Sequence, residues 1–440
     1  MLDIKYIREN VDDIAKTIKQ KGIDLDIVEL IEIDKQRVSL IKEVEELNSL
    51  KNDLNSLIRN ASTQSEREEL IKKGKIFKEK LEIKEPFLKE IEKKFMELMA
   101  KVPTVQASDV PIGKDDSENV VVYEWGKKPS FSFKPKSHVE LAEELDIIDF
   151  KRGVKVSGFR GYYLKNEGVD LVMALMNYAM HKIASKGFRG MIPPTIVKEK
   201  VLFGSGYFSG TTYNGEVDEV YQVITSDKDL EGDKERKFLV GTAEPSLLAY
   251  YSNEVISESE LPIKIYGFSQ CYRSEIGSHG KDTTGLYRVH EFMKVEQIVL
   301  TKADKDEAIK AQEEMIAISE EIHKELGLPY RKLAICTGDL SAGKYRQFDM
   351  EVWMPGLGRW GETGSASIFL DWQSRRLNVK YKNKDGKKKY VYMLNNTVLP
   401  SPRPLIAILE NYQQEDGSVV VPEVLIPFMI NKAKVIRPKK

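Results

Sequence analysis

The first hundred residues carry two runs of apolar residues with the spacing of a heptad repeat. In the first run the two core positions are taken by Ile33, Leu40, Leu47 and Leu54 and by Arg37, Val44, Lys51 and Ile58. The second run alternates steps of four and three residues through Leu70, Gly74, Phe77, Leu81, Lys84, Leu88, Ile91, Phe95 and Leu98. This repeat predicts two long helices, each with an apolar stripe that needs a partner.

The polar stretch RNASTQSERE separates the two runs, and Ser65 within it is expected to cap the second helix. An antiparallel helical hairpin that projects as an arm is the economical interpretation. The pattern fits an ordinary helical bundle or a dimerising coiled coil equally well. Within the second helix, Gly74 costs about 1 kcal/mol relative to alanine, and Pro86 is expected to kink the helix or interrupt its hydrogen bonds.

The character of the chain changes after residue 101. The stretch KVPTVQASDVPIGKDDSEN has no periodicity and is predicted to be a linker. Beyond it, short strand candidates (KFLVG, IKIYGFSQCYR, HEFMKVEQIVL and KYVYML) alternate with helical stretches such as DKDEAIKAQEEMIAISEEIHKELG, and Asp385-Gly386 is a candidate hairpin turn. We therefore expect an α+β protein with a helical domain at 1–110 and a domain with a mostly antiparallel sheet at 111–440.

Composition limits the class of protein. The chain has 68 Lys+Arg and 69 Asp+Glu, which excludes a uniformly basic protein that wraps nucleic acid. Only two cysteines are present, which excludes a disulfide framework. The start MLDIKYIREN does not resemble a signal peptide, and no apolar run reaches the ~18 residues of a membrane span. We expect a soluble, cytoplasmic protein that does not associate with membranes.

Several common catalytic signatures are missing from the sequence. It contains no GxxxxGK[ST] phosphate loop and no GxGxxG after a strand, and its five histidines form no zinc pattern. No serine lies in a nucleophile-elbow context. Chemistry therefore has to come from another combination of residues.

The most suggestive segment is CYRSEIGSHGKDTTGLYRVHEFMKVEQ, residues 271–297. One strand ends in Arg273-Ser274-Glu275, a polar loop follows, and a second strand returns from Arg288 to Gln297 with Glu296 near its end. Guanidinium groups bind phosphate in a bidentate manner, and carboxylates can hold a substrate ammonium. Judged by charge alone, a solvated hairpin explains this segment better than a binding site.

Three further stretches place polar residues beside strand or helix ends. GTAEPSL places Thr242 and Glu244 after a strand. GRWGETGSASIFLDWQSRR places Glu362, Ser365 and Ser367 directly after or within a glycine-rich segment. NNTVLPSPRPLIAILENYQ places Asn395, Thr397 and Arg403 before an apolar helix. An arginine near a helix N-terminus is well placed for phosphate or a purine face.

Taken together, these segments resemble the seryl-tRNA synthetase family of class II aminoacyl-tRNA synthetases over nearly the full chain. KGFRGMIPPTIVKEKVLFGSGYF is similar to the family's motif 1, with Pro193 and Pro194 in a dimer-interface strand. RSEIGSHGKDTTGLYRVHEFMKVEQ is similar to motif 2, and NNTVLPSPRPLIAILENYQ is similar to motif 3. The resemblance implies a homodimer, a sheet of six or seven antiparallel strands that holds ATP, and a helical arm that binds tRNA.

The resemblance also assigns residues. ATP would contact Arg273, Ser274, Glu275, Val289, Glu362, Thr363, Gly364, Ser365 and Arg403, with Arg273, Glu362 and Arg403 as the catalytic set and Mg²⁺ held through ATP by Glu362 and Ser365. L-Serine would contact Thr242, Ala243, Glu244, Arg273, Glu296, Asn395 and Thr397. The expected reaction is formation of seryl-adenylate and pyrophosphate, followed by transfer of serine to tRNA(Ser) and also to tRNA(Sec).

Two other functions remain open. A synthetase-like paralogue would activate an amino acid but charge a carrier protein or nothing, and such proteins typically lack the long arm. A coiled-coil adaptor with a degenerate catalytic domain would have no need of Arg273, Glu275, Glu296, Glu362 and Arg403 together.

Overall fold

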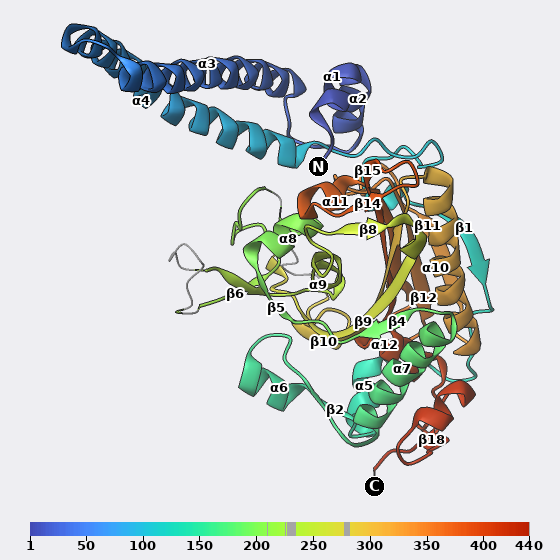
Figure 1. The fold of residues 1–440 in the computed structure, drawn as a ribbon. Coiled ribbons are helices and arrows are strands. Elements are labelled where there is room, and N and C mark those ends of the chain that lie inside the picture. The colour runs from blue at the N-terminus through green and yellow to red at the C-terminus, as the bar shows by residue number, and fades with distance from the viewer. Residues whose placement is uncertain (209, 225, 227–234, 277–281, 440) are drawn as a thin grey trace. The chain divides into compact units, whose positions relative to one another are not determined.

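The computed structural model describes residues 1–208, 210–224, 226, 235–276 and 282–439, and the chain forms two compact units (Figure 1). The helical unit comprises Leu2–Lys19 and Ile23–Val102. The sheet unit comprises Met1, Gln20–Gly22 and Pro103–Lys440. Residues 277–281 of the loop expected between Glu275 and Arg288, including His279, lie outside the described residues.

The helical unit is built on an antiparallel hairpin, as the heptads predict. Its helices are α1 (Ile4–Glu9), α2 (Val11–Gln20), α3 (Ile27–Asn60) and α4 (Gln64–Lys101). α3 and α4 lie side by side (Figure 1), and ion pairs join them from Lys94 to Glu29 and from Lys84 to Glu43. Every predicted core position on both helices is buried or half-buried. The apolar stripe of each helix is therefore covered by the other.

Three details of α4 refine the prediction. Thr63, not Ser65, caps the helix, because its Oγ1 accepts a hydrogen bond from the Glu66 N–H at 3.2 Å, whereas Ser65 already lies inside the helix. Gly74 faces α3 so closely that a Cβ there would lie 3.2 Å from Leu54 Cδ2. Pro86 lies inside α4, which continues past it as one helix to Lys101.

The sheet unit is organised around an eight-stranded sheet (Figure 1). In spatial order its strands are β1 (Val120–Trp125), β11 (Tyr330–Ala334), β12 (Arg346–Met354), β13 (Arg359–Leu370), β16 (Tyr392–Pro400), β10 (Glu291–Thr301), β9 (Ile263–Tyr272) and β4 (Arg189–Met191). The seven strands from β1 to β9 pair antiparallel, and β4 pairs with β9 in parallel. The predicted antiparallel sheet is present, and β4 makes it mixed.

Strand alternation gives this sheet two different faces. On β10, Val295 and Val299 point into the larger hydrophobic core, which is covered by α7 (Asn166–Ser185), α10 (Lys305–Glu325) and α12 (Pro402–Asn411). Ile298 and Leu300 point to the other face, where α9 (Glu244–Ala249) and α11 (Trp372–Leu377) pack. The same face therefore also carries the even-numbered polar residues of β10, Lys294 and Glu296.

Shorter elements complete the sheet unit. The helices are α5 (His138–Glu144), α6 (Phe150–Ser157) and α8 (Glu199–Ser205). The small sheets pair β2 (Ile148–Asp149) with β3 (Tyr163–Leu164), β5 (Ile196–Lys198) and β6 (Tyr221–Val223) with β7 (Lys237–Leu239), β8 (Val255–Ser257) and β15 (Lys388–Tyr390) with β14 (Lys380–Lys382), and β17 (Val419–Val420) with β18 (Val435–Ile436). β14 and β15 form the predicted hairpin, in which Gly386 has a φ of 78°.

The predicted linker is irregular but firmly packed. The Thr104 N–H donates to the Ala342 carbonyl at 2.8 Å, and the Ala107 N–H donates to the Tyr345 carbonyl at 2.9 Å. Val102 and Thr104 are almost fully buried. Because this stretch lacks the periodicity of a helix or strand, its pattern gave no sign of this packing.

None of the helices in the described ranges is both long and apolar enough to cross a lipid bilayer.

Candidate active site

A cavity of about 750 Å³ opens on the face of the sheet that carries the polar residues of β10. A second, narrower pocket of about 80 Å³ adjoins it. The two cavities share the residues that lie between them, namely Arg273, Tyr287, Arg288, Lys294, Glu362, Thr397 and Arg403. The two cavities therefore form one continuous site. Its walls include residues of the predicted motif 2 segment, 271–297, and of the start of α12.

Arg403 and Glu362 form one wall of the site. Pro402 is the first residue of α12, where a missing N–H costs no hydrogen bond, and Arg403 follows it in the first turn. Arg403 Nη1 donates to Glu362 Oε2 and to the Glu362 carbonyl, both at 2.9 Å. Its guanidinium also lies over the Tyr287 ring, 4.6 Å from the centroid. Although burial alone would raise the pKa of Glu362, the Arg403 guanidinium lowers it, so this carboxylate stays ionised.

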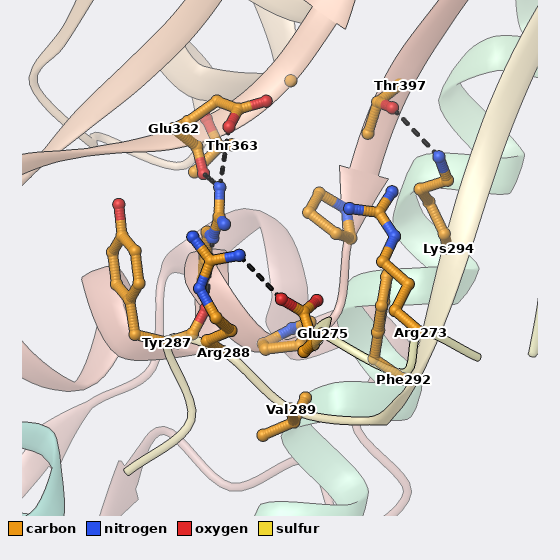
Figure 2. A pocket seen from close by; sticks show the side chains of 14 residues that line it. Arg273, Glu275, Tyr287, Arg288, Val289, Phe292, Lys294, Glu362, Thr363 and Thr397 are labelled. Atoms are coloured by element: carbon orange, nitrogen blue, oxygen red, sulfur yellow. Dashed lines mark hydrogen bonds and ion pairs between the residues drawn. The ribbon is translucent and has the colours of Figure 1, made fainter. Parts of the chain in front are cut away.

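Glu275 and Arg288 form a second ion pair in the narrow pocket. Arg288 Nη1 lies 2.7 Å from Glu275 Oε2, and Figure 2 shows the arginine pointing toward this carboxylate, with Val289 below them. Arg160 Nη1 lies 3.7 Å from the same oxygen. Glu275 has a φ of 56°, a left-handed conformation that non-glycine residues rarely adopt. Strain of this kind concentrates at functional sites.

Arg273 lies where the two cavities meet, at the end of β9. Its Nε donates to the Gly241 carbonyl at 3.4 Å, and its guanidinium lies 5.5 Å from the centroid of the Phe292 ring. Phe292 lines the narrow pocket together with Arg403. The narrow pocket thus offers an aromatic ring and guanidinium groups, which suit the faces of a purine.

Glu296, Lys294 and Thr397 form a hydrogen-bonded cluster deep in the site. Glu296 Oε2 lies 2.7 Å from Lys294 Nζ and accepts a hydrogen bond from Thr397 Oγ1 at 3.1 Å. Lys294 Nζ also donates to Thr397 Oγ1 at 3.2 Å (Figure 2). The register between β10 and β16 shifts at Val295–Glu296, and such a bulge re-aims the side chains beside it.

Glu244 extends this cluster from α9. Its Oε1 accepts a hydrogen bond from Gln373 Nε2 at 2.7 Å, and its N–H donates to Thr242 Oγ1 at 3.4 Å. Burial first, and then the charge of Glu296, raise the pKa of Glu244, while hydrogen bonds from Gln373 and Asn395 oppose the rise. Two carboxylates and an amide therefore converge on one small volume beside Lys294.

A third acidic group, Asp349 on β12, lies near Glu362. Burial and the Glu362 charge raise the pKa of Asp349 to about 7, and hydrogen bonds from Gln347 and Ser365 limit the rise. Mg²⁺ prefers oxygen ligands and usually needs only one or two carboxylates besides substrate phosphates. Glu362, Asp349 and Ser365 provide such oxygens, and in the described ranges no group of three metal-binding side chains surrounds a single point. The donor set therefore fits an ion that a bound polyphosphate itself would largely coordinate.

The structure brings nearly all of the predicted site residues together. The cavity walls include Thr242, Glu244, Arg273, Glu275, Val289, Glu296, Glu362, Thr363, Gly364, Ser365, Asn395, Thr397 and Arg403. Ala243 and Ser274 do not line either cavity. Ala243 is fully buried against Leu247, and the Ser274 N–H donates to the Glu219 carbonyl at 3.4 Å.

Sequence reasoning missed several residues that line the site. Phe292 and Lys294 precede Glu296 on β10 at intervals of two, so strand alternation alone would have placed them on the same face. Tyr287 precedes that strand, and Arg288, which was noted as the start of the returning strand, was not assigned to the site. Asp349 and Lys344 come from β12 and the loop before it, and no local pattern connects them with the other residues.

Comparisons with known proteins identify the family of the chain. Residues 1–105 match the family model of the seryl-tRNA synthetase N-terminal domain, and residues 221–412 match that of the tRNA synthetase class II core domain (G, H, P, S and T). A serine–tRNA ligase of Treponema denticola is 42% identical over 430 residues, which cover 97% of this chain and 98% of the relative.

Two solved structures are similar over the whole chain. Seryl-tRNA synthetase from Pyrococcus horikoshii complexed with ATP has a TM-score of 0.87 at 35% identity and covers 100% of both chains. A cytoplasmic serine–tRNA ligase from Naegleria fowleri in complex with AMP has a TM-score of 0.83 at 30% identity and covers 100% of this chain and 99% of the other. Identity at this level over the full length of both helical and sheet units places the chain in the seryl-tRNA synthetase family of class II aminoacyl-tRNA synthetases.

Proposed function

We propose that the chain is a serine–tRNA ligase. It activates L-serine with ATP to seryl-adenylate and pyrophosphate, and it then transfers serine to the 3′ end of tRNA(Ser). The observation that supports this most is the continuity of the site. The narrow pocket lined by Phe292 and Arg403 is continuous with the larger cavity that contains Glu296, and Arg273 lines both.

The chemistry of the first step suits a site without a catalytic histidine or serine. A carboxylate oxygen of serine attacks the α-phosphorus of ATP, a new oxygen–phosphorus bond forms, and the bond to the pyrophosphate leaving group breaks. This displacement needs in-line placement and neutralisation of charge more than it needs an acid or base. Arg273 at the junction would hold both the α-phosphate and the serine carboxylate.

The nucleotide would occupy the narrow pocket. Glu275, fixed by Arg288, is placed to accept a hydrogen bond from the adenine amino group, while Val289 and Phe292 cover the base and Arg403 stacks on it. Thr363 and Gly364 line the same pocket, and Ser274 supports it from the chain beside Glu275. Mg²⁺ would be held by Glu362 and Ser365 through the phosphates, and it would supply charge neutralisation for the leaving pyrophosphate.

Serine would occupy the pocket around Glu296. Within the described part of the chain, both contacts of this carboxylate use Oε2, so Oε1 is available to the serine ammonium. Thr397 and Asn395 on β16 and Thr242 and Glu244 at the start of α9 provide hydrogen-bonding groups for the hydroxyl. A site with such buried polar groups rejects alanine, because binding alanine would leave those groups unpaired.

The helical unit would bind tRNA through its exposed lysines and arginines, by shape and backbone contacts that weaken with salt. The proposal has three further parts. The protein forms a homodimer through the segment around Pro193 and Pro194, it is located in the cytoplasm, and it also charges tRNA(Sec). The cytoplasmic relative from Naegleria fowleri supports the location.

The decisive experiment is ATP–pyrophosphate exchange with each of the twenty amino acids in the absence of tRNA. Exchange with serine alone, followed by charging of tRNA(Ser), supports the proposal. Exchange with serine but no charging would favour the carrier-charging paralogue. Exchange with a different amino acid would overturn the serine pocket, and no exchange at all would favour the adaptor.

A further inference from the structure

The loop that joins β11 to β12 places a lysine in the cavity that none of the assignments above uses. Lys344 and Ser341 line the 750 Å³ cavity on the side of Asp349 and Glu362. Lys344 Nζ donates to Gln347 Oε1 at 2.6 Å, and Gln347 Nε2 donates to Asp349 Oδ1 at 2.7 Å. A chain of hydrogen bonds therefore leads from this lysine to the acidic end of the site.

Most cations of the cavity are already neutralised by a carboxylate. Arg403 pairs with Glu362, Arg288 with Glu275, Arg331 with Glu351, and Lys294 with Glu296. In the described part of the chain, the Lys344 ammonium forms a hydrogen bond only with the neutral amide of Gln347 and no ion pair. Its positive charge therefore remains available to an anionic ligand.

The backbone of residues 341–345 is held in place by contacts with Lys21 and with α11. Lys21 Nζ donates to the Lys344 carbonyl at 2.7 Å and to the Ser341 and Ala342 carbonyls, both at 3.4 Å. A Cβ at Gly343 would lie 2.7 Å from Trp372 Cε3, so the loop also packs directly on α11. With the bonds from Thr104 and Ala107 described above, the loop is held on several sides.

Lys21 has no other visible role. Only 6% of the residue is exposed, and among the described residues its Nζ pairs with no carboxylate. Burying an amino group without a counter-charge is unfavourable. Burial, and then the charge of Lys344, lower the pKa of Lys21 to about 7. Among the described residues, the bonds to the loop carbonyls are what offset this unfavourable burial.

We propose that Lys344 binds the β- and γ-phosphate oxygens of the nucleotide, and that Lys21 is a positioning residue that holds the Lys344 backbone in place. The inference rests on the proposed function, because it names a further contact for the same ATP. Three carboxylates line this end of the cavity, Asp349, Glu351 and Glu362, so a polyphosphate needs a cation here besides its metal ion.

Serine-dependent ATP–pyrophosphate exchange with the full-length protein tests the proposal. Lys344→Met should raise KM for ATP and for pyrophosphate by about ten-fold to a hundred-fold, the range for one lost charge-assisted hydrogen bond. KM for serine should stay within about two-fold. Lys21→Met should raise KM for ATP in the same direction by a smaller factor, and Lys19→Met, at an exposed lysine two residues away, should leave it unchanged.

The double variant distinguishes positioning from a general structural effect. If Lys21 acts through Lys344, then the double variant Lys21→Met/Lys344→Met has the same KM for ATP as the single variant Lys344→Met. If Lys21→Met does not fold, Lys21→Gln, which keeps a donor, takes its place in the cycle. An unchanged KM for ATP in Lys344→Met overturns the phosphate contact, and multiplicative effects in the double variant overturn the positioning role. If the unaltered protein shows no exchange with serine, it is the proposed function that fails.

Discussion

Lys294 and Glu296 lie two residues apart on β10, on the same face of the sheet, and their side chains form an ion pair of 2.7 Å inside the cavity. Both side chains are almost fully buried. Burial alone would lower the pKa of Lys294, but the Glu296 carboxylate raises it above its ordinary value, so Lys294 stays protonated. The proposed serine pocket thus contains a desolvated ion pair, and the two members of this pair should respond differently to substitution.

Glu296→Gln should disable serine recognition while sparing nucleotide binding. The substitution keeps the size of the side chain but removes the charge that pairs with the serine ammonium. We expect kcat/KM for serine in the exchange reaction to fall by at least about thirty-fold, since a buried charge pair is worth roughly 2–5 kcal/mol on truncation. ATP binding, measured by calorimetry, should change by less than about two-fold. Glu314→Gln, at a carboxylate on α10 that is 44% exposed, is the matched control. Normal serine turnover by Glu296→Gln would refute the assignment.

Lys294→Met should cost stability as well as activity, because it leaves Glu296 buried without a partner. Breaking a buried ion pair from one side typically costs about 3–5 kcal/mol. The double variant Lys294→Met/Glu296→Gln removes both charges, so its free energy of unfolding should return most of the way to that of the unaltered protein. Urea denaturation of the three proteins measures this recovery. If the single and double variants are equally unstable, the pair is not the source of the loss.

The two long helices of the helical unit could be predicted from the sequence, because a heptad repeat is formed by residues that lie close together along the chain. The strands β9 and β10 and the helix α10 could be predicted for the same reason, since alternation and helical periodicity are local. The strand candidate KYVYML, in contrast, is divided between β15 and β16. The cap of α4 was misplaced by two residues because Thr63 and Ser65 are chemically equivalent as caps, and the register of the helix decides between them.

The site could be predicted only in part, because some of its residues are brought together by long-range contacts. Residues in the segments 271–297 and 395–403 could be assigned because these segments resemble motifs 2 and 3 of the family, whereas their charge alone did not single them out. Asp349 belongs to the site because β12 pairs with β13, which places Asp349 opposite Ser365. The sequence around Asp349 contains no pattern that predicts this pairing. Lys21 lies more than 300 residues from the loop that it holds. Contacts of this range depend on the folded sheet.

Shortening the hairpin should separate the two proposed steps. Glu43 and Lys84 form an ion pair across α3 and α4, so the helices are adjacent at that level. Replacing residues 44–83 by a short Gly-Ser linker there keeps the lower hairpin, including the Lys94–Glu29 pair. We expect serine-dependent exchange within about two-fold of normal, and kcat/KM for tRNA charging lower by at least about a hundred-fold, because the tRNA contacts are lost. Charging at normal efficiency would assign the hairpin a different function.

Pro86→Ala should stabilise the helical unit. Pro86 lies on an exposed position inside α4 and contributes no backbone N–H to that helix. Alanine restores the donor, and proline is about 3 kcal/mol less favourable than alanine in a helix interior. The free energy of unfolding of the helical unit, followed by circular dichroism, should rise by up to that amount. Lys89→Ala, at another exposed position of α4, should change it by less than about 0.5 kcal/mol. A loss of stability in Pro86→Ala would mean that α4 depends on the bend that proline allows.

The buried amino group of Lys21 should make stability depend on pH in a predictable direction. Burial and the Lys344 charge lower its pKa from 10.5 to about 7 in the folded protein. Between pH 7 and about 10 the unfolded chain therefore binds a proton at this position that the folded protein does not bind. The contribution of Lys21 to the free energy of unfolding should accordingly rise with pH in that window, by up to about 1.4 kcal/mol per unit of pH. Below pH 7 both states carry the proton, so the contribution is at its lowest and constant.

The difference in free energy of unfolding between the unaltered protein and Lys21→Met isolates this group, because the titrations of all other residues cancel. Urea denaturation at pH 6, 7, 8 and 9 should show a difference that is flat up to pH 7 and then grows in favour of the unaltered protein. The same difference for Lys19→Met should be flat throughout, since that lysine is exposed. A flat difference for Lys21→Met, or one that shrinks as the pH rises, would mean that Lys21 keeps an ordinary pKa and is not enclosed by the loop carbonyls.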